Sequence, residues 1–174
     1  MRIMGANWEL LLVDDNSEPE ELRWVHTYLA AARFPQRIRL AQAGALWPES
    51  PAPNLGKILN HCLDQVPADV DYYLNLESDV YLHSDTLVHL AAAVQDSNAP
   101  MACPLQLTLN GDRADFIFWG AGLIPLEQFE TFDDFGILRY RARPKWCNLG
   151  CLLVRGDVAR DQRRRVDEQF NLFC

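Results

Sequence analysis

The sequence is short of basic residues and has no long apolar run. Lysine and arginine together number 16 against 24 aspartates and glutamates, so the formal charge is −8. Such a chain is poorly suited to nucleic acid, because phosphate recognition normally requires a basic stripe. No run approaches a membrane span, and Glu9 interrupts the opening apolar segment and spoils it as a signal peptide. We therefore expect a cytoplasmic protein with no nucleic-acid partner and no transmembrane segment.

Paired cysteine motifs are also lacking. The five cysteines are odd in number, and no two of them have CxxC spacing. Reduced, mostly buried thiols are the expected state, and a zinc site is not indicated. No internal repeat or low-complexity tract is present either. What the chain does have is 174 residues, 49% of them hydrophobic, which is enough to bury a core and suits one domain.

The first half of the chain alternates strand-like and helix-like segments. Strands are predicted at Trp8–Val13, Ile38–Leu40 and Tyr72–Leu76, the second of them at a sheet edge. Helices are predicted after Ser17 as N-cap, over Gly56–Val66, and from Ser84 or Asp85 to Val94. The first helix has apolar residues at helical spacing, namely Leu22, Val25, Leu29 and Ala32. A proline-rich loop connects Leu40 to the second helix, so the order is β, α, β, loop, α, β.

The second half is less regular. Short strands are predicted at Met101–Leu109 and Asp115–Trp119 about an Asn110–Gly111 turn, and another apolar run covers Cys147–Val154. Gly120–Gly136 has no clear period. A short helix rich in arginine is expected after Asp157.

Two acids follow the predicted strand Tyr72–Leu76. Glu77 and Asp79 are separated only by Ser78, so both carboxylates can converge beyond the carboxyl end of the strand, where open α/β sheets bind ligands. A pair of hard oxygen donors suits a divalent cation that keeps several waters and is shared with a diphosphate. The alternative is a pair of acids that only solubilise a turn.

Five local patterns occur in the order and approximate spacing of family 2 glycosyltransferases, which have the GT-A fold. They are LLVDDNS (Leu11–Ser17), NLGKILN (Asn54–Asn60), YYLNLESDV (Tyr72–Val80), NLGCLLVRGDV (Asn148–Val158) and VDEQF (Val166–Phe170). The chain resembles this family over nearly its whole length. The resemblance implies an α/β fold with a mixed, mainly parallel sheet flanked by helices, and sugar transfer with inversion from a nucleotide-diphosphate donor to an acceptor hydroxyl.

The resemblance also implies donor-binding residues. Asp15 matches the position that contacts the base of the nucleotide, and Asn54, Gly56 and Asn60 match a segment beside the donor, with Lys57 near enough to approach phosphate. Gly150 belongs to another of the matching segments. For Asp15 the alternative role is a helix cap, and for Lys57 it is a solvated helix residue.

The metal site follows from the same resemblance. Glu77-Ser78-Asp79 matches the DxD position, which implies Mg2+ or Mn2+ held by Asp79 and by Glu77, a departure from the usual aspartate. His83 follows closely and is either a further ligand or a solvated loop histidine.

Both ends of the family pattern are missing from the chain. Only seven residues precede Trp8, where the family has a further strand and helix, and the catalytic base is expected beyond Cys174. We therefore expect one GT-A-like domain over 1–174, truncated at both ends, with a nucleotide-binding part near 8–100 and an acceptor side near 101–174.

Acceptor and rival functions stay open at this point. The acceptor is expected to be a saccharide or a lipid-linked intermediate. The arginines from Arg155 to Arg165 could contact an anionic lipid-linked acceptor or the inner face of a membrane. The alternative is that they form a solvated helix face. A non-catalytic nucleotide-sugar-binding module is one alternative. A receiver-like phosphoacceptor domain is another, although Glu77 stands where the phosphorylated aspartate would be.

Overall fold

The computed structural model describes residues 7–47, 55–104, 106–110, 113–119, 122–125 and 150–166, and these form two compact units. The first unit comprises Met1–Ala68 and Arg160–Cys174, and the second comprises Asp69–Ala159. Neither boundary falls near residue 100, where the sequence placed the change from nucleotide side to acceptor side. The expectation of a single GT-A-like domain stays a prediction.

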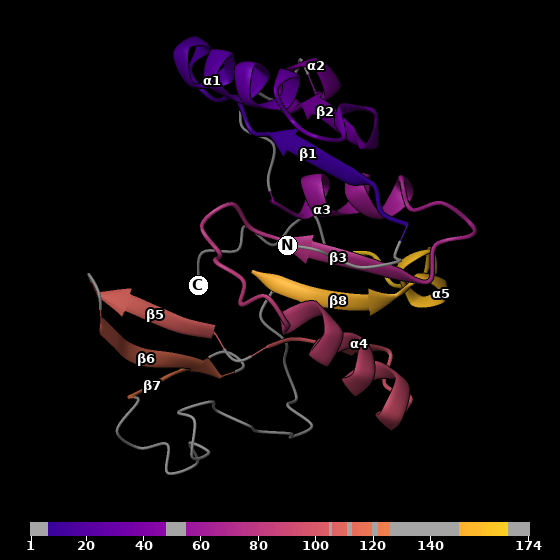
Figure 1. The fold of residues 1–174 in the computed structure, drawn as a ribbon. Helices are drawn as coiled ribbons and strands as arrows, with labels where there is room; N and C mark the ends of the chain where they lie inside the picture. Colours follow the sequence, from indigo (N-terminus) through magenta and orange to yellow (C-terminus); the bar gives the residue numbers. More distant parts are fainter. Residues whose placement is uncertain are drawn as a thin grey trace. The chain divides into compact units, whose positions relative to one another are not determined.

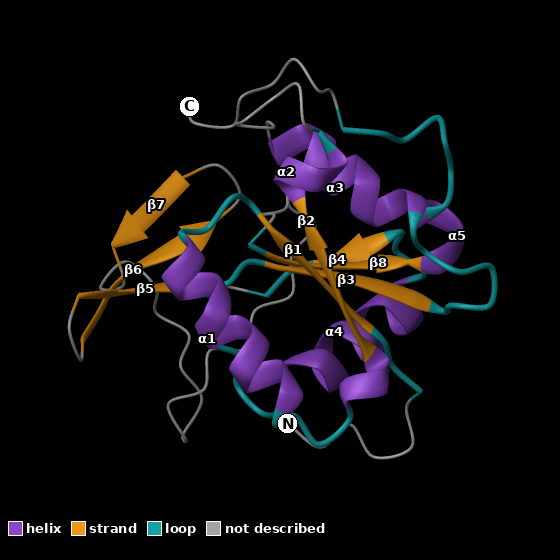
Figure 2. Cartoon of the chain, turned by 90° about the horizontal axis from the view of Figure 1, so that it is seen from above, coloured by secondary structure: helices purple, strands orange, loops and turns teal. Residues whose placement is uncertain are grey.

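The first unit is built on a parallel pair of strands, β1 (Leu10–Asp14) and β2 (Ile38–Gln42), with Leu10 opposite Ile38 and Asp14 opposite Gln42. A parallel pair needs a crossover, which α1 (Pro19–Ala30) supplies, followed by the 3-10 turn Pro35–Arg37. β2 has one described neighbour, as expected of an edge strand. Helices α2 (Ala43–Leu46) and α3 (Leu55–Asp64) follow. In Figures 1 and 2, α1 and α3 lie on opposite sides of the strand pair.

Helix α1 confirms its predicted face but begins one residue later than predicted. Leu22, Val25 and Leu29 are half-buried and the helix residues between them are exposed, whereas Ala32, the fourth residue of the expected face, is half-buried but lies beyond the end of the helix. The N-cap is Glu18, not Ser17, because Pro19 occupies the first helical position, and the Glu18 backbone N–H donates to the Glu21 carboxylate (3.3 Å).

The second unit contains a three-stranded sheet in the order β3–β8–β4. β3 (Tyr72–Leu76) and β4 (Met101–Ala102) each pair antiparallel with β8 (Cys151–Arg155), which lies between them. Helix α4 (Thr86–Ser97) packs on this sheet, and α5 (Gly156–Ala159) follows β8 (Figure 1). The fold is therefore mixed α/β as expected. The described pairings are mainly antiparallel, however, because β8 runs against both neighbours.

The core of the second unit lies between α4 and β8. Leu90 and Val94 of α4 meet Cys151 and Leu153 of β8, and all four are buried. Residues packed around them are Tyr72, Leu74, Val80, Leu82, Leu87, Ala91 and Ala102. β8 begins within the apolar run Cys147–Val154 and is buried, whereas β3, whose nearly continuous apolar run is typical of a strand covered on both faces, is only half-buried.

A second sheet of this unit is an antiparallel meander of β5 (Gln106–Asn110), β6 (Arg113–Trp119) and β7 (Gly122–Pro125). β5 and β6 correspond to the predicted strands, except that the first predicted strand is divided into β4 and β5. β7 was not predicted. Gly136–Arg143, which alternates in part in the sequence, lies outside the described residues. In the described part of the chain no helix is both long enough and apolar enough to cross a bilayer.

Candidate functional site

The acid pair lies where β3 ends. The Glu77 backbone N–H donates to the Gly150 carbonyl oxygen (2.9 Å), so the strand stays tied to the segment leading into β8 for one residue beyond Leu76. The Val80 N–H then donates to the Glu77 carbonyl oxygen (3.2 Å) and closes a turn that holds Ser78 and Asp79. The structure thus brings Glu77, Asp79 and Gly150 together, with the two acids exposed and Gly150 buried.

The Glu77 carboxylate is affected by its surroundings and by its neighbour. Partial desolvation, and next the negative charge of Asp79, raise the pKa of Glu77 above its ordinary value. Neither carboxylate makes a hydrogen bond or ion pair to another described residue. Two adjacent carboxylates without a cationic partner form a site that a divalent cation would stabilise.

The described residues contain no group of three or more histidine, cysteine, aspartate or glutamate side chains arranged to hold a metal ion. A two-carboxylate site instead fits an ion that keeps waters and takes phosphate oxygens as its other ligands. His83 is exposed, and its Nδ1 accepts the Asp85 backbone N–H (3.4 Å), as for a loop histidine.

A second set of predicted residues lies in the first unit, at the carboxyl end of β1. The Asp14 carboxylate accepts the Ser17 backbone N–H (3.2 Å), and Asn16 has the left-handed φ of 60°. A Cβ on Gly44 would lie 2.7 Å from the Asn16 side-chain oxygen, so the bare glycine of α2 lets this turn pack closely. Asp15 is exposed beside these contacts and makes no hydrogen bond or ion pair within the described residues, which leaves its carboxylate available to a ligand.

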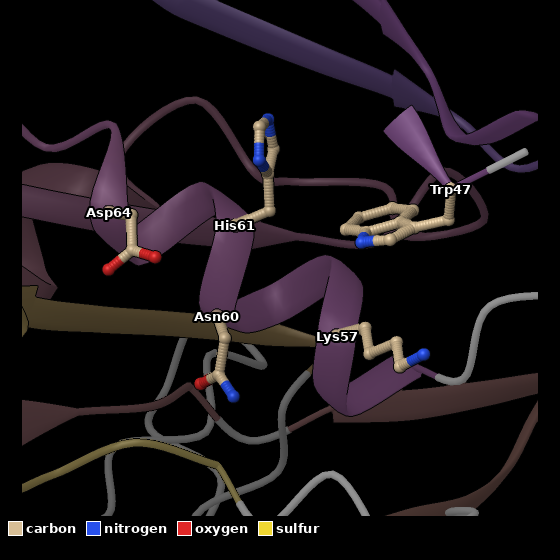
Figure 3. A pocket seen from close by; sticks show the side chains of 5 residues that line it. All are labelled: Trp47, Lys57, Asn60, His61 and Asp64. Atoms are coloured by element: carbon tan, nitrogen blue, oxygen red, sulfur yellow. The ribbon is translucent and has the colours of Figure 1, made fainter. Parts of the chain in front are cut away.

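Helix α3 forms one side of an open pocket of about 220 Å³. The lining side chains are Trp47, Lys57, Asn60, His61 and Asp64 (Figure 3). The Trp47 and His61 rings meet edge to face, with centroids 5.7 Å apart. The pocket therefore combines a cation, an aromatic pair and a carboxylate, a mixture suited to a polar, ring-containing ligand.

The Asn60 side chain is hydrogen-bonded to the backbone of Val166. It is buried, and its side-chain amide donates to the Val166 carbonyl oxygen and accepts the Val166 N–H, both at 2.9 Å. This reciprocal pair of bonds fastens the returning chain to α3. Of the predicted donor residues on this helix, Lys57 lines the pocket, Gly56 is buried, and Asn60 shapes the pocket wall.

Most of the late arginines have partners within the protein. Arg165 pairs with Asp64 (2.7 Å), Arg163 and Arg164 both pair with Asp161, and Arg160 donates to the Pro67 carbonyl oxygen (2.8 Å). The expectation of a short arginine-rich helix is wrong, because α5 ends at Ala159 and contains no arginine, and the arginines from Arg160 to Arg165 follow it in turns, bends and irregular chain. These arginines tie the last described segment to α3 and to itself.

Sequence reasoning missed Trp47, His61 and Asp64 as pocket residues. A signal was present, because Lys57, Asn60, His61 and Asp64 follow the i, i+3, i+4, i+7 spacing of one helix face. The predicted residues fall into separate sets: Glu77, Asp79 and Gly150 in the second unit, Gly56, Lys57 and Asn60 on α3, and Asp15 after β1. Asn54 lies outside the described residues.

Comparison of the chain with protein-family models, with curated proteins and with solved structures found no match.

Proposed function

We propose that this chain carries the donor side of a metal-assisted glycosyltransferase of GT-A type. The observation that carries the proposal is the pair of exposed carboxylates, Glu77 and Asp79, immediately after β3, which form no ion pair within the described part of the chain. Mixed α/β topology, the exposed Asp15 after β1 and the pocket beside Lys57 support it further.

Glu77 and Asp79 would hold Mg2+ or Mn2+, and the bound ion would stabilise negative charge on the departing diphosphate. The chain's own residues would do the positioning. Asp15 would accept a hydrogen bond from a nucleobase N–H, and the Lys57 ammonium would approach phosphate. A saccharide or lipid-linked acceptor hydroxyl would then attack the opposite face of the sugar, giving inversion.

Calorimetric titration with UDP, GDP and dTDP, with and without Mn2+, tests this proposal. We expect metal-dependent binding of a nucleotide that Asp79→Ala weakens by about tenfold or more, since removing a charged partner typically exceeds 1.4 kcal/mol. Asp69→Ala is the matched control, because Asp69 is an exposed aspartate in the turn before β3. Equal binding by wild type and Asp79→Ala would remove Asp79 from the site.

A nucleotide-sugar-binding module without transfer is the second candidate. It needs only the residues already assigned, because Asp15, Glu77 and Asp79 would contact donor or metal and none of them would act as general base. A transfer assay on a chain extended at both ends separates the two, because a binder would hold the donor without turnover. The receiver-like alternative loses support from the antiparallel β3–β8 pairing, since doubly wound receiver sheets are parallel. Labelling by acetyl phosphate would restore it.

A further inference from the structure

Positive charge is concentrated in one stretch of this acidic chain. Between Leu22 and Pro48 there are four arginines, at 23, 33, 37 and 39, and no aspartate or glutamate, although the whole chain has a formal charge of −8. All of this stretch belongs to the first unit. This stretch therefore carries positive charge, opposite in sign to the net charge of the whole chain.

Two of these arginines are stacked on aromatic rings. The Arg37 guanidinium lies 5.5 Å from the Trp8 ring centroid and 5.8 Å from that of Phe34, and Arg33 lies 5.1 Å from Phe34. Trp8 and Phe34 meet edge to face at 6.0 Å. We call these four residues, Trp8, Arg33, Phe34 and Arg37, the cationic aromatic cluster. Stacking holds the guanidinium planes in place while their N–H groups stay available to an anion.

The cluster differs from the late arginines in its partners. Arg163, Arg164 and Arg165 each form an ion pair with an aspartate. In the part of the chain that the structure describes, Arg33 and Arg37 form no ion pair with a carboxylate. The cluster therefore offers positive charge that no described carboxylate neutralises by an ion pair.

The strand register places the cluster at one end of the sheet. Trp8 precedes β1 and Arg37 precedes β2, and the first residues of the two strands, Leu10 and Ile38, lie opposite each other. Leu10 is 41% exposed and Phe34 is 39% exposed, so apolar surface accompanies the charge. Asp15 follows β1 at its other end, about 16 Å of extended strand away.

We propose that the cationic aromatic cluster is a docking surface for an anionic phospholipid membrane. Arginines attract acidic headgroups, whereas Trp, Phe and Leu side chains insert at the interfacial level, and the cluster presents both together. The acidic end of β1 would be repelled and would face away from the bilayer, which leaves Asp15 open to a soluble ligand. The proposal does not depend on sugar transfer.

Cosedimentation with vesicles tests the docking surface. Wild type should bind phosphatidylcholine vesicles that contain phosphatidylserine, bind pure phosphatidylcholine weakly, and release as NaCl is raised. Arg33→Gln/Arg37→Gln should lower the partition coefficient by roughly tenfold or more, because each arginine near an anionic surface contributes strongly. Phe34→Ala keeps the charge, and it should cause a smaller loss. Thermal melting followed by circular dichroism checks that each variant is folded.

Arg163→Gln/Arg164→Gln is the matched control. It removes the same charge from the same unit, at side chains that are 88% and 57% exposed but already paired with Asp161. This control should bind like wild type. An equal loss in the control would show a general charge effect and overturn the proposal. Displacement by inorganic phosphate but not by chloride of equal ionic strength would also overturn it, because the cluster would then take a single phosphate ion instead of a lipid surface.

Discussion

The two units are stabilised by different kinds of contact. Of the nine buried hydrophobic side chains in the described residues, seven belong to the second unit and only Ala43 and Leu59 to the first. β8 is buried from Cys151 to Val154, whereas no residue of β1 is buried. A two-stranded sheet with so little apolar burial is marginal by itself. The first unit therefore depends more on polar ties, above all those between α3 and the segment from Arg160 to Val166.

Truncating a core leucine should give the largest difference in stability loss between the two units. Leu153→Ala removes a side chain that is 6% exposed and packed against α4, and it should lower the free energy of unfolding by about 2–5 kcal/mol. Leu12→Ala, in the half-buried β1, should cost less than half as much, because water already reaches that side chain. Urea denaturation of both variants, followed by circular dichroism, measures the difference. Equal losses would contradict the contrast in burial.

A polar substitution on α3 should have an intermediate effect. Asn60→Ala removes both bonds to Val166 and leaves a partly buried backbone N–H and carbonyl without these partners, at a cost of about 1–3 kcal/mol. Asn60→Asp, its matched variant, can still accept the Val166 N–H but cannot donate to the carbonyl, and it should fall between alanine and wild type. Thermal melting gives the stabilities.

Limited proteolysis supplies the local readout for the same pair of variants. Loss of the ties should expose the chain near Val166 to cleavage before the second unit is cut, because sub-global opening releases the weaker contacts first. A stability loss below a few tenths of a kcal/mol for Asn60→Ala would show that the first unit does not rely on this tie.

The sequence was a good guide to the inward face of helix α1, where apolar residues recur at helical spacing. Leu22, Val25 and Leu29 are half-buried and the residues between them are exposed. The apolar run Cys147–Val154 likewise contains most of the buried strand β8. The position of β8 between β3 and β4 could not be predicted in this way, because periodicity reports which face is covered and not which strand is the neighbour. β7 lies in a segment with no clear period and was missed for that reason.

The candidate site shows the same limit. Glu77 and Asp79 were identified because acids directly after a strand are a local pattern, and the structure keeps them exposed there. Asn60 was expected beside the donor, yet its partner Val166 lies 106 positions later, and no local pattern encodes that pairing. Arg165 likewise pairs with Asp64 of α3, 101 positions earlier in the sequence. Long-range polar contacts are therefore the part that sequence patterns leave undetermined.

The smallest expected effect is the pH dependence of stability that comes from Glu77, an exposed carboxylate at the end of β3 in the second unit. The pKa of Glu77 is raised in the fold, so the native state binds more protons than the unfolded state between the ordinary value of 4.5 and the raised value. Stability from this group is therefore present below pH 4.5 and is lost as pH rises through the raised pKa. Glu77→Gln should remove that part of the pH profile, as measured by thermal melting.

The response to Mn2+ tests the same carboxylates. If Glu77 and Asp79 hold Mn2+, the ion should stabilise the charged carboxylate and lower the pKa of Glu77. It should then raise the melting temperature of wild type more than that of Glu77→Gln. An identical response to Mn2+ in both proteins would place the ion elsewhere, and the acid pair would then be a solvated turn.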